Sequence, residues 1–154
     1  MPDNKIALFL RCIEDGHFPP DLMPYDFIKQ CEAIIKSLPH SEGNVTHIFS
    51  NGIYAREASV PSGSIVSSKL HKKEHIFTVS KGIVSVFSTT EGLKLIQAPY
   101  TGITKPGTKR LIYAHTDLVW TTYHATDKKT VEEVEEEVIE NDESNLIKLL
   151  GGEQ

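Results

Sequence analysis

The spacing of apolar residues divides the chain into helical ends and a middle that is rich in short strands. Over residues 4–15, apolar side chains recur at the intervals of one helix face from Ile6 to Ile13, which predicts an amphipathic helix. A second apolar stripe begins at Pro24, a residue favoured in the first turn of a helix, and ends near Leu38. We interpret these two predicted helices as a cap over the segment that follows.

From residue 45 onward, the pattern changes to short β-rich runs separated by turn signals such as Asn51-Gly52 and Pro106-Gly107. The predicted strands are 46–49, 53–60, 64–70, 75–80, 83–88, 93–98, 109–115 and 119–125. Short strands at regular spacing, without long helical interruptions, are typical of an antiparallel sandwich or barrel. The fold class predicted from the pattern is therefore mainly β, closed or double-sheeted, rather than α/β.

The C-terminal region predicts a helix again. Thr130 and Glu133 match a capping box, and apolar residues from Val131 to Ile139 form one face. The acidic run 132–137 is then the solvated face of this helix, and an acidic recognition tail is the alternative. Apolar residues at 146–150 predict a further helical turn that packs on the barrel or on a partner subunit.

Composition narrows the classes of protein that fit this pattern. The 154 residues suit one domain, divided into a helical cap over 1–44, a barrel over 45–126 and an acidic C-terminal helix over 127–154. A net charge of -5 argues against general binding to nucleic acids or membrane surfaces. We recognise no targeting segment, so we expect a cytoplasmic protein with Cys12 and Cys31 as buried, reduced thiols.

The segment 63–82 carries the candidate chemistry, and it reads GSIVSSKLHKKEHIFTVSKG. It resembles the first signature of the cupin superfamily, which is a glycine, five residues, His-x-His, three or four residues, a glutamate, six residues and a glycine. Starting from Gly63, the first histidine position holds Lys69, the second holds His71, the glutamate position holds His75, and the closing glycine is Gly82. The spacing matches throughout, and His75 replaces glutamate by another residue able to bind a metal.

The second cupin signature is matched more weakly. With Gly107 as its turn glycine, the proline position holds Lys105, the histidine position holds Arg110 and the asparagine position holds Ala114. The resemblance covers about residues 54–126, and the whole chain also resembles small uncharacterised cupin-like proteins encoded by bacteriophages, which would place it in the host cytoplasm. It implies a double-stranded β-helix, a small jelly-roll barrel whose members usually hold a metal on three histidines and one glutamate.

Three histidines form the predicted metal site. Alternation along a strand turns His75 and Phe77 to one face, and a hairpin centred on Asp117 would make Arg110 and His124 cross-strand neighbours. This predicts a metal set of His71, His75 and His124 that suits Zn, Fe, Ni, Cu or Mn, and the sequence does not choose among them. Glu74 is a possible fourth ligand that alternation turns away from the pocket.

The departures from the signature support a different ligand. Lys69 and Arg110 are fixed cations at two metal-ligand positions, and two cations beside a dication are electrostatically unfavourable. They suit an anionic small molecule, such as a nucleotide or phosphosugar, that the protein captures without catalysis. Lys105 and Lys109 would add charge at the mouth of the pocket, and Phe77 and Trp120 would form its walls.

A third alternative is a structural, oligomeric protein with an inert barrel. Exposed strand edges need to be covered, and cupins often pair through barrel edges, so we expect a homodimer or a higher oligomer. The sequence contains no Walker loop, no Cys-x-x-Cys motif and no nucleophile elbow. Whether the protein is an enzyme, and of which reaction, stays open at this level.

Overall fold

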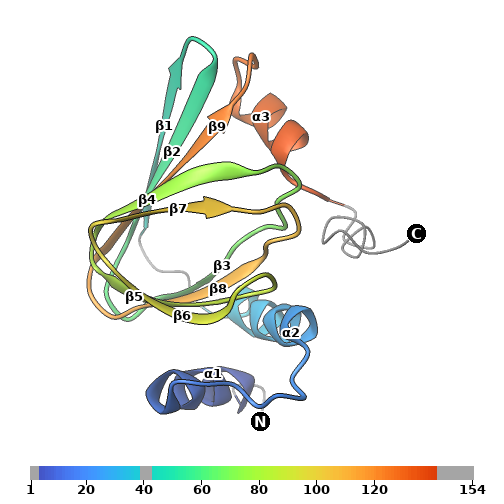
Figure 1. The fold of residues 1–154 in the computed structure, drawn as a ribbon, viewed down its shortest axis with the longest axis vertical. Coiled ribbons are helices and arrows are strands. Elements are labelled where there is room, and N and C mark those ends of the chain that lie inside the picture. The colour runs from blue at the N-terminus through green and yellow to red at the C-terminus, as the bar shows by residue number, and fades with distance from the viewer. Residues whose placement is uncertain (1–3, 39–42, 142–154) are drawn as a thin grey trace.

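The computed structural model describes residues 4–38 and 43–141 (Figure 1). Its helices are α1 (Asn4–Asp15), α2 (Pro24–Lys36) and α3 (Val131–Val138). Its strands are β1 (Asn44–Ser50), β2 (Ile53–Val60), β3 (Ile65–Ser67), β4 (His75–Lys81), β5 (Ile83–Ser88), β6 (Gly92–Gln97), β7 (Tyr100–Thr104), β8 (Arg110–Ala114) and β9 (Leu118–Ala125). Within these ranges, no helix is both long and apolar enough to cross a membrane.

The strands form two antiparallel sheets that face each other. One sheet has the order β1-β2-β9-β4-β7 and the other has the order β3-β8-β5-β6. If the strands are counted from β2, these orders are 1-8-3-6 and 2-7-4-5, with β1 as an extra edge strand. This is the arrangement of a jelly roll built from two Greek keys. The predicted mainly β fold, a double-stranded β-helix with helical additions, is therefore confirmed.

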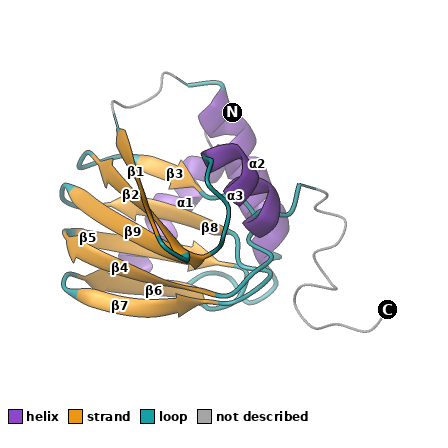
Figure 2. Cartoon of the chain, turned by 90° about the horizontal axis from the view of Figure 1, so that it is seen from above, coloured by secondary structure: helices purple, strands orange, loops and turns teal. Residues whose placement is uncertain are grey.

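Helices α1 and α2 cover the outer face of the four-stranded sheet (Figure 2). Phe9, Phe27 and Cys31 on the helices are almost fully buried against Phe87 of β5 and Leu111 of β8. The cap predicted from the apolar stripes therefore has a defined position on one sheet. Cys12 also lies buried, and both cysteines are free thiols.

The interior of the barrel changes from apolar to polar along its length. On β4, Val79 and Phe77 face inward as part of the apolar core, and His75 faces inward at the start of the strand. Antiparallel pairing brings the start of β4 beside the ends of β7 and β9. Polar residues on three strands, His75, Thr104 and His124, therefore meet at one end of the barrel, and all three are buried.

Two features of the predicted β region are wrong. Strand β7 was not predicted, because its sequence YTGIT is short and contains Gly102. The hairpin expected at Asp117 is absent: β8 pairs with β3 and β5, whereas β9 pairs with β2 and β4. The turn before β9 carries the chain from one sheet to the other, so Arg110 and His124 are not cross-strand neighbours.

Helix α3 lies beside the polar end of the barrel. The Thr130 hydroxyl accepts a hydrogen bond from the Glu133 backbone N–H at 3.2 Å, so Thr130 is the N-cap as predicted. The Glu133 carboxylate accepts from the Thr130 hydroxyl at 3.0 Å, which is not the second bond of a capping box. Val134 and Val138 pack with Tyr54 of β2, and Ile139 forms an antiparallel bridge with His71. The helical turn predicted over 146–150 lies outside the described residues.

Candidate functional site

The three predicted metal-site histidines lie together at the polar end of the barrel. The ring centroids of His75 and His124 are 4.3 Å apart, and those of His71 and His75 are 4.9 Å apart. His75 begins β4 and His124 lies next to it near the end of β9, while His71 precedes β4 in an irregular segment. The sequence spacing alone placed His71 and His75 together, whereas sheet pairing brings in His124.

Each imidazole has one ring nitrogen beside a protein oxygen. Nδ1 of His71 lies 3.3 Å from the Thr108 carbonyl oxygen, and Nδ1 of His75 lies 3.2 Å from the Lys73 carbonyl oxygen. Because a carbonyl only accepts, these Nδ1 atoms are the protonated donors, and Nε2 of each ring carries the lone pair. Nε2 of His124 lies 3.0 Å from the Thr122 hydroxyl.

The site favours neutral imidazoles. Burial is the main cause that lowers the pKa of His71 to about 3, and His75 and Arg110 lower it further. Burial also lowers the pKa of His75 and of His124 to about 4, with Arg110 contributing at His75 and His75 contributing at His124. All three rings are therefore uncharged at pH 7, which leaves their lone pairs available to a metal ion or to a hydrogen-bond donor.

Arg110 brings a buried positive charge into the same interior. Arg110 is 5% exposed, and its Nη2 donates a hydrogen bond to the Thr104 hydroxyl at 3.0 Å. The guanidinium carbon lies 4.9 Å from the ring centroid of Phe77 and 5.3 Å from that of Trp120. Burial lowers the pKa of Arg110 to about 10, so the side chain is still a cation at pH 7.

The aromatic wall under Arg110 depends on a glycine. Phe77 and Trp120 stack at a centroid distance of 4.6 Å with 10° between their planes. Gly102 on β7 is the cross-strand partner of Phe77, and a Cβ atom there would lie 2.9 Å from the rings of Phe77 and Tyr100. A side chain at position 102 would push the Phe77 ring out of its stack with Trp120. Gly102, the residue that made β7 hard to predict, is therefore needed for the aromatic wall of the site.

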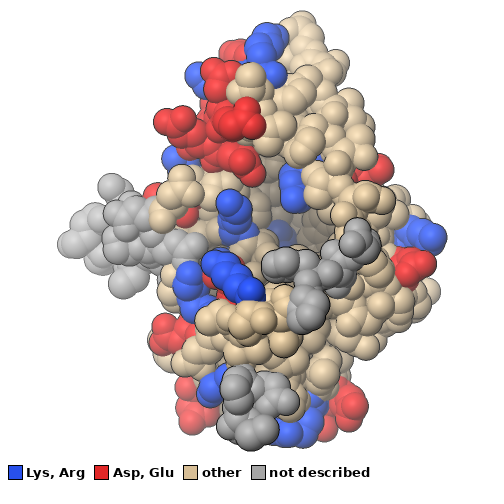
Figure 3. Space-filling model, turned by 180° about the vertical axis from the view of Figure 1, so that it is seen from behind, with Lys and Arg blue, Asp and Glu red and all other residues tan. Residues whose placement is uncertain are grey.

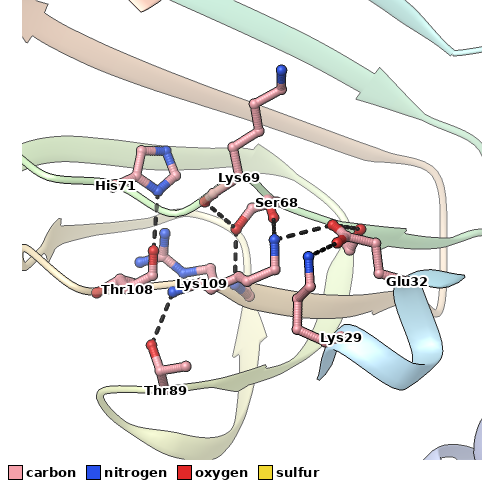
Figure 4. A network of polar contacts seen from close by, with 10 residues as sticks. Lys29, Glu32, Ser68, Lys69, His71, Thr89, Thr108 and Lys109 are labelled. Atoms are coloured by element: carbon pink, nitrogen blue, oxygen red, sulfur yellow. Dashed lines mark hydrogen bonds and ion pairs between the residues drawn. The ribbon is translucent and has the colours of Figure 1, made fainter. Parts of the chain in front are cut away.

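Of the three lysine residues expected near the pocket, Lys69 and Lys105 lie at the surface and Lys109 is buried. Lys69 is exposed, and its side chain extends away from the neighbouring polar network (Figure 4). Lys105 pairs with Glu74 at 3.0 Å on the surface, which also turns Glu74 away from the histidines, as alternation predicted. The predicted role of Lys109 at the pocket mouth is wrong, because Lys109 is 1% exposed and points out of the barrel toward α2.

Lys109 instead connects the barrel to α2 (Figure 4). Its Nζ donates to Oε2 of Glu32 at 3.0 Å and to the Ser68 carbonyl oxygen at 2.8 Å, and the Ser67 hydroxyl donates to the same Glu32 oxygen at 2.9 Å. Burial alone would raise the pKa of Glu32, but the hydrogen bonds from Lys109 and Ser67 outweigh it and lower the pKa to about 2. Lys109, which precedes β8, thus places one cation in the helix interface, and Arg110, the first residue of β8, places another inside the barrel.

Sequence reasoning missed Tyr54 and its partner His47. The Tyr54 hydroxyl lies 2.6 Å from Nδ1 of His47, and the Tyr54 ring lies 5.9 Å from the ring of His124. Tyr54 is 2% exposed and is covered by α3. No local signal marks this contact, because it depends on the register between β1, β2 and β9.

The surface around the barrel is uneven in shape and in charge. One side of the molecule is hollowed near its centre, and lysine or arginine side chains border the hollow (Figure 3). Acidic side chains gather away from it, in the upper part of the same view. A small ligand that approaches from this side therefore meets positive charge at the hollow.

Comparison with known proteins finds solved structures of low similarity and no sequence match. No protein-family model and no curated protein matches the sequence. A cupin superfamily protein from Desulfitobacterium hafniense has a TM-score of 0.48 and 8% identity, over 62% of this chain and 86% of that chain. An acetylacetone dioxygenase from Acinetobacter johnsonii has a TM-score of 0.44 and 15% identity, over 57% and 66% of the two chains.

A protein of unknown function from Streptococcus pyogenes is similar to the same degree, with a TM-score of 0.46 and 9% identity over 59% of this chain and 80% of that chain. At these values, the likeness carries no argument, and the jelly-roll assignment depends on the order of the strands in the two sheets. The resemblance to phage-encoded proteins finds no support in these comparisons.

Proposed function

We propose that the protein binds a small molecule inside the barrel, at a divalent metal centre held by His71, His75 and His124. The observation that supports this proposal is a pair of buried ring nitrogens, His75 Nε2 and His124 Nδ1, which have no hydrogen-bond partner in the described part of the chain. A buried polar atom without a hydrogen bond costs about 1–3 kcal/mol. A metal ion bound to these nitrogens would supply the missing partner and remove this destabilisation.

The donor set fits such an ion in its chemistry. Metal-binding imidazoles usually have their second nitrogen held by a carbonyl, carboxylate or hydroxyl oxygen, and Thr108, Lys73 and Thr122 supply such oxygens here. The rings are neutral at pH 7, as metal binding requires. Within residues 4–38 and 43–141, no three His, Cys, Asp or Glu side chains are already arranged around one point, so the rings would have to turn to converge.

The chain's own residues would bind and shield the ligand. The imidazoles would hold the ion, the stacked Phe77 and Trp120 would exclude water from one wall, and α3 would cover the end of the barrel beside His71. A bound Zn, Fe, Ni, Cu or Mn ion would supply Lewis-acid or oxygen chemistry. The proposal stops at binding and assigns no reaction.

Substitution of His75 tests the metal centre most directly. We expect tag-free wild-type protein to contain a divalent metal in stoichiometric amount, because three neutral imidazoles with free lone pairs meet at the site. His75→Ala removes the central ligand and should abolish retention of the metal through gel filtration. Elemental analysis measures the metal content, and a thermal-unfolding curve with and without chelator measures its effect on stability.

The matched control is His115→Ala. His115 lies on the outer side of the same barrel, where Nε2 contacts the Ser85 hydroxyl at 2.7 Å, so its loss should leave the metal content unchanged. Metal-free wild-type protein whose melting temperature responds neither to chelator nor to added Zn, Fe, Ni, Cu or Mn would contradict the proposal. Equal metal loss in the two variants would also contradict it.

The outer face of the five-stranded sheet supports a second proposal, self-association of the chain. Ile48, Ile76 and Ile103 are exposed there at 50%, 51% and 50%. Ala55 and Tyr123 lie between them in cross-strand register, so one apolar row runs from edge strand β1 to edge strand β7. An exposed apolar row of this kind marks a contact surface, and we propose a homodimer that buries it.

Ile76→Asp within this row tests the homodimer. We expect wild-type protein to be a dimer in gel filtration with light scattering, and the variant to raise the dimer dissociation constant roughly tenfold or more, because an apolar contact inside the row is replaced by a charge. Leu95→Asp, at a 67% exposed position on β6 of the other sheet, should leave the dimer intact. Monomeric wild-type protein at tens of micromolar would rule this surface out as a dimer contact.

A further inference from the structure

Arg110 is a buried cation without a counter-ion in the described part of the chain. Its guanidinium has one hydrogen-bond acceptor there, the Thr104 hydroxyl, and no carboxylate lies within ion-pair distance of it in residues 4–38 and 43–141. The remaining N–H donors of the guanidinium therefore have no protein partner in these ranges. A buried charge that is left without a partner strongly destabilises a folded protein.

The neighbouring residue provides an internal comparison. Lys109 is buried to a similar degree, and it is neutralised by Glu32 at 3.0 Å and bound by the Ser68 carbonyl oxygen. Arg110 has aromatic rings in place of a carboxylate. Phe77 and Trp120 attract the guanidinium through their π faces and hold it in position, but they carry no charge to neutralise it.

No nearby imidazole compensates for this charge, because the ring of a histidine is either neutral or positively charged and never negative. The carboxylate of Glu91 attracts Arg110 electrostatically without contacting it, and its ion-pair partner is Lys94 at 3.8 Å. The carboxylate of Glu137 lies on the side of His124 and pairs with Lys73 at 3.6 Å, so it does not neutralise Arg110. Arg110 thus has no charged partner among the described residues, and the ring nitrogens His75 Nε2 and His124 Nδ1 in the same interior have no hydrogen-bond partner there.

We propose that Arg110 binds the carboxylate of a small hydroxycarboxylic acid inside the barrel. The planar fork of a guanidinium matches a carboxylate in two parallel hydrogen bonds. One positive charge balances one carboxylate, whereas sites for phosphate usually add further cations or a cluster of backbone N–H groups. One of the unpartnered nitrogens of His75 and His124 then accepts the single hydrogen bond that the ligand's hydroxyl can donate. With a metal ion held by these rings, the hydroxyl oxygen would bind the ion instead. The inference rests on the proposed function for the place of the ligand, and it does not depend on a metal.

Binding is tested by calorimetry and thermal shift on the full chain, before and after chelator treatment. The probes are lactate, malate and gluconate, the amides of these acids and inorganic phosphate. We expect at least one hydroxycarboxylate to bind and to raise the melting temperature, while its amide does not. Arg110→Met should weaken this binding roughly tenfold or more, and Arg110→Lys should weaken it less, because it keeps the charge and loses the fork.

The variants also give a readout that does not need a ligand. Methionine fills a similar volume beside Phe77 and Trp120 without a charge, so the ligand-free Arg110→Met protein should melt at least as high as wild type. Lys81→Met removes an exposed lysine at the opposite end of β4 from His75 and is the control that should leave binding unchanged. The inference is overturned if no hydroxycarboxylate binds, if phosphate binds and carboxylates do not, or if Arg110→Met binds as wild type. Carboxylate binding by metal-free protein would uphold it even if the metal proposal fails.

Discussion

Replacing Gly82 by alanine is expected to destabilise the protein by about 3 kcal/mol or more, through backbone strain combined with a steric overlap. Gly82 has a φ of +103°, which side chains with a Cβ rarely adopt. A Cβ atom at this position would overlap the Asp117 carbonyl oxygen and lie 3.0 Å from Cα of Leu118. These neighbours are backbone atoms at the start of β9, so they cannot move aside as a flexible side chain would. Urea unfolding measures the change.

The control for Gly82→Ala is Gly63→Ala, at the other end of the same motif. Gly63 also has a positive φ, of +85°, but no atom lies within 4 Å of its hypothetical Cβ. Its replacement should therefore cost only the backbone term, about 1–2 kcal/mol. Equal losses at the two glycines would show that the contact with Asp117 contributes nothing. A Gly82→Ala protein that cannot be purified in folded form, beside a measurable Gly63→Ala protein, agrees with the expected order.

Lys109→Met is expected to lower the free energy of unfolding by about 2–3 kcal/mol, because Oε2 of Glu32 loses its buried cationic partner while Lys29 still pairs with Oε1. Glu32 on α2 would retain Ser67 and Lys29 as hydrogen-bond donors, while the Ser68 carbonyl oxygen would lose Nζ of Lys109. Urea unfolding at pH 7 measures the loss. The comparison with Arg110→Met is informative, since the two substitutions remove adjacent buried cations and should have opposite effects on the ligand-free protein.

A double variant and a pH series isolate the ion pair. Glu32→Leu combined with Lys109→Met removes both charges and should recover most of the loss. In wild type, the pKa of Glu32 falls from 4.5 in the unfolded chain to about 2, so the folded state holds the carboxylate in its charged form. This stabilisation is complete above about pH 4.5 and decreases as the pH falls toward 2. A wild-type unfolding free energy whose acid dependence equals that of the double variant would contradict this role for Glu32.

Much of the fold follows from local patterns in the sequence. Strands β2 and β5 occupy the predicted ranges 53–60 and 83–88, because alternation and flanking turn residues are local signals. Helix α1 spans the predicted residues 4–15 for the same reason. Strand β3 ends at Ser67, short of the predicted residue 70, since the chain there turns toward Thr108, and this contact is not visible in the local pattern.

The candidate site is predictable only in part. The motif spacing placed His71 and His75 together, and the strand alternation put Phe77 on the side of His75. The sequence pattern also named His124 and Arg110, but with the wrong geometry between them, because it assumed a hairpin at Asp117. They lie on strands of different sheets, and both are buried. Lys69, chosen because it fills a ligand position of the motif, is exposed.

The segment 63–82 and the pair Lys109-Arg110 show what the sequence determines by itself and what the tertiary structure decides. Glycine spacing and two-residue alternation are properties of the chain, so they identify the turns, the strands and the two faces of each strand. Which of those faces lies inside the barrel depends on sheet pairing between distant strands. The ion pair between Lys109 and Glu32, and the position of Arg110 beside the imidazoles without a carboxylate, are therefore visible only in the folded structure. Desolvation of a charge depends on every group around it, and the groups around Arg110 come from strands far apart in the chain.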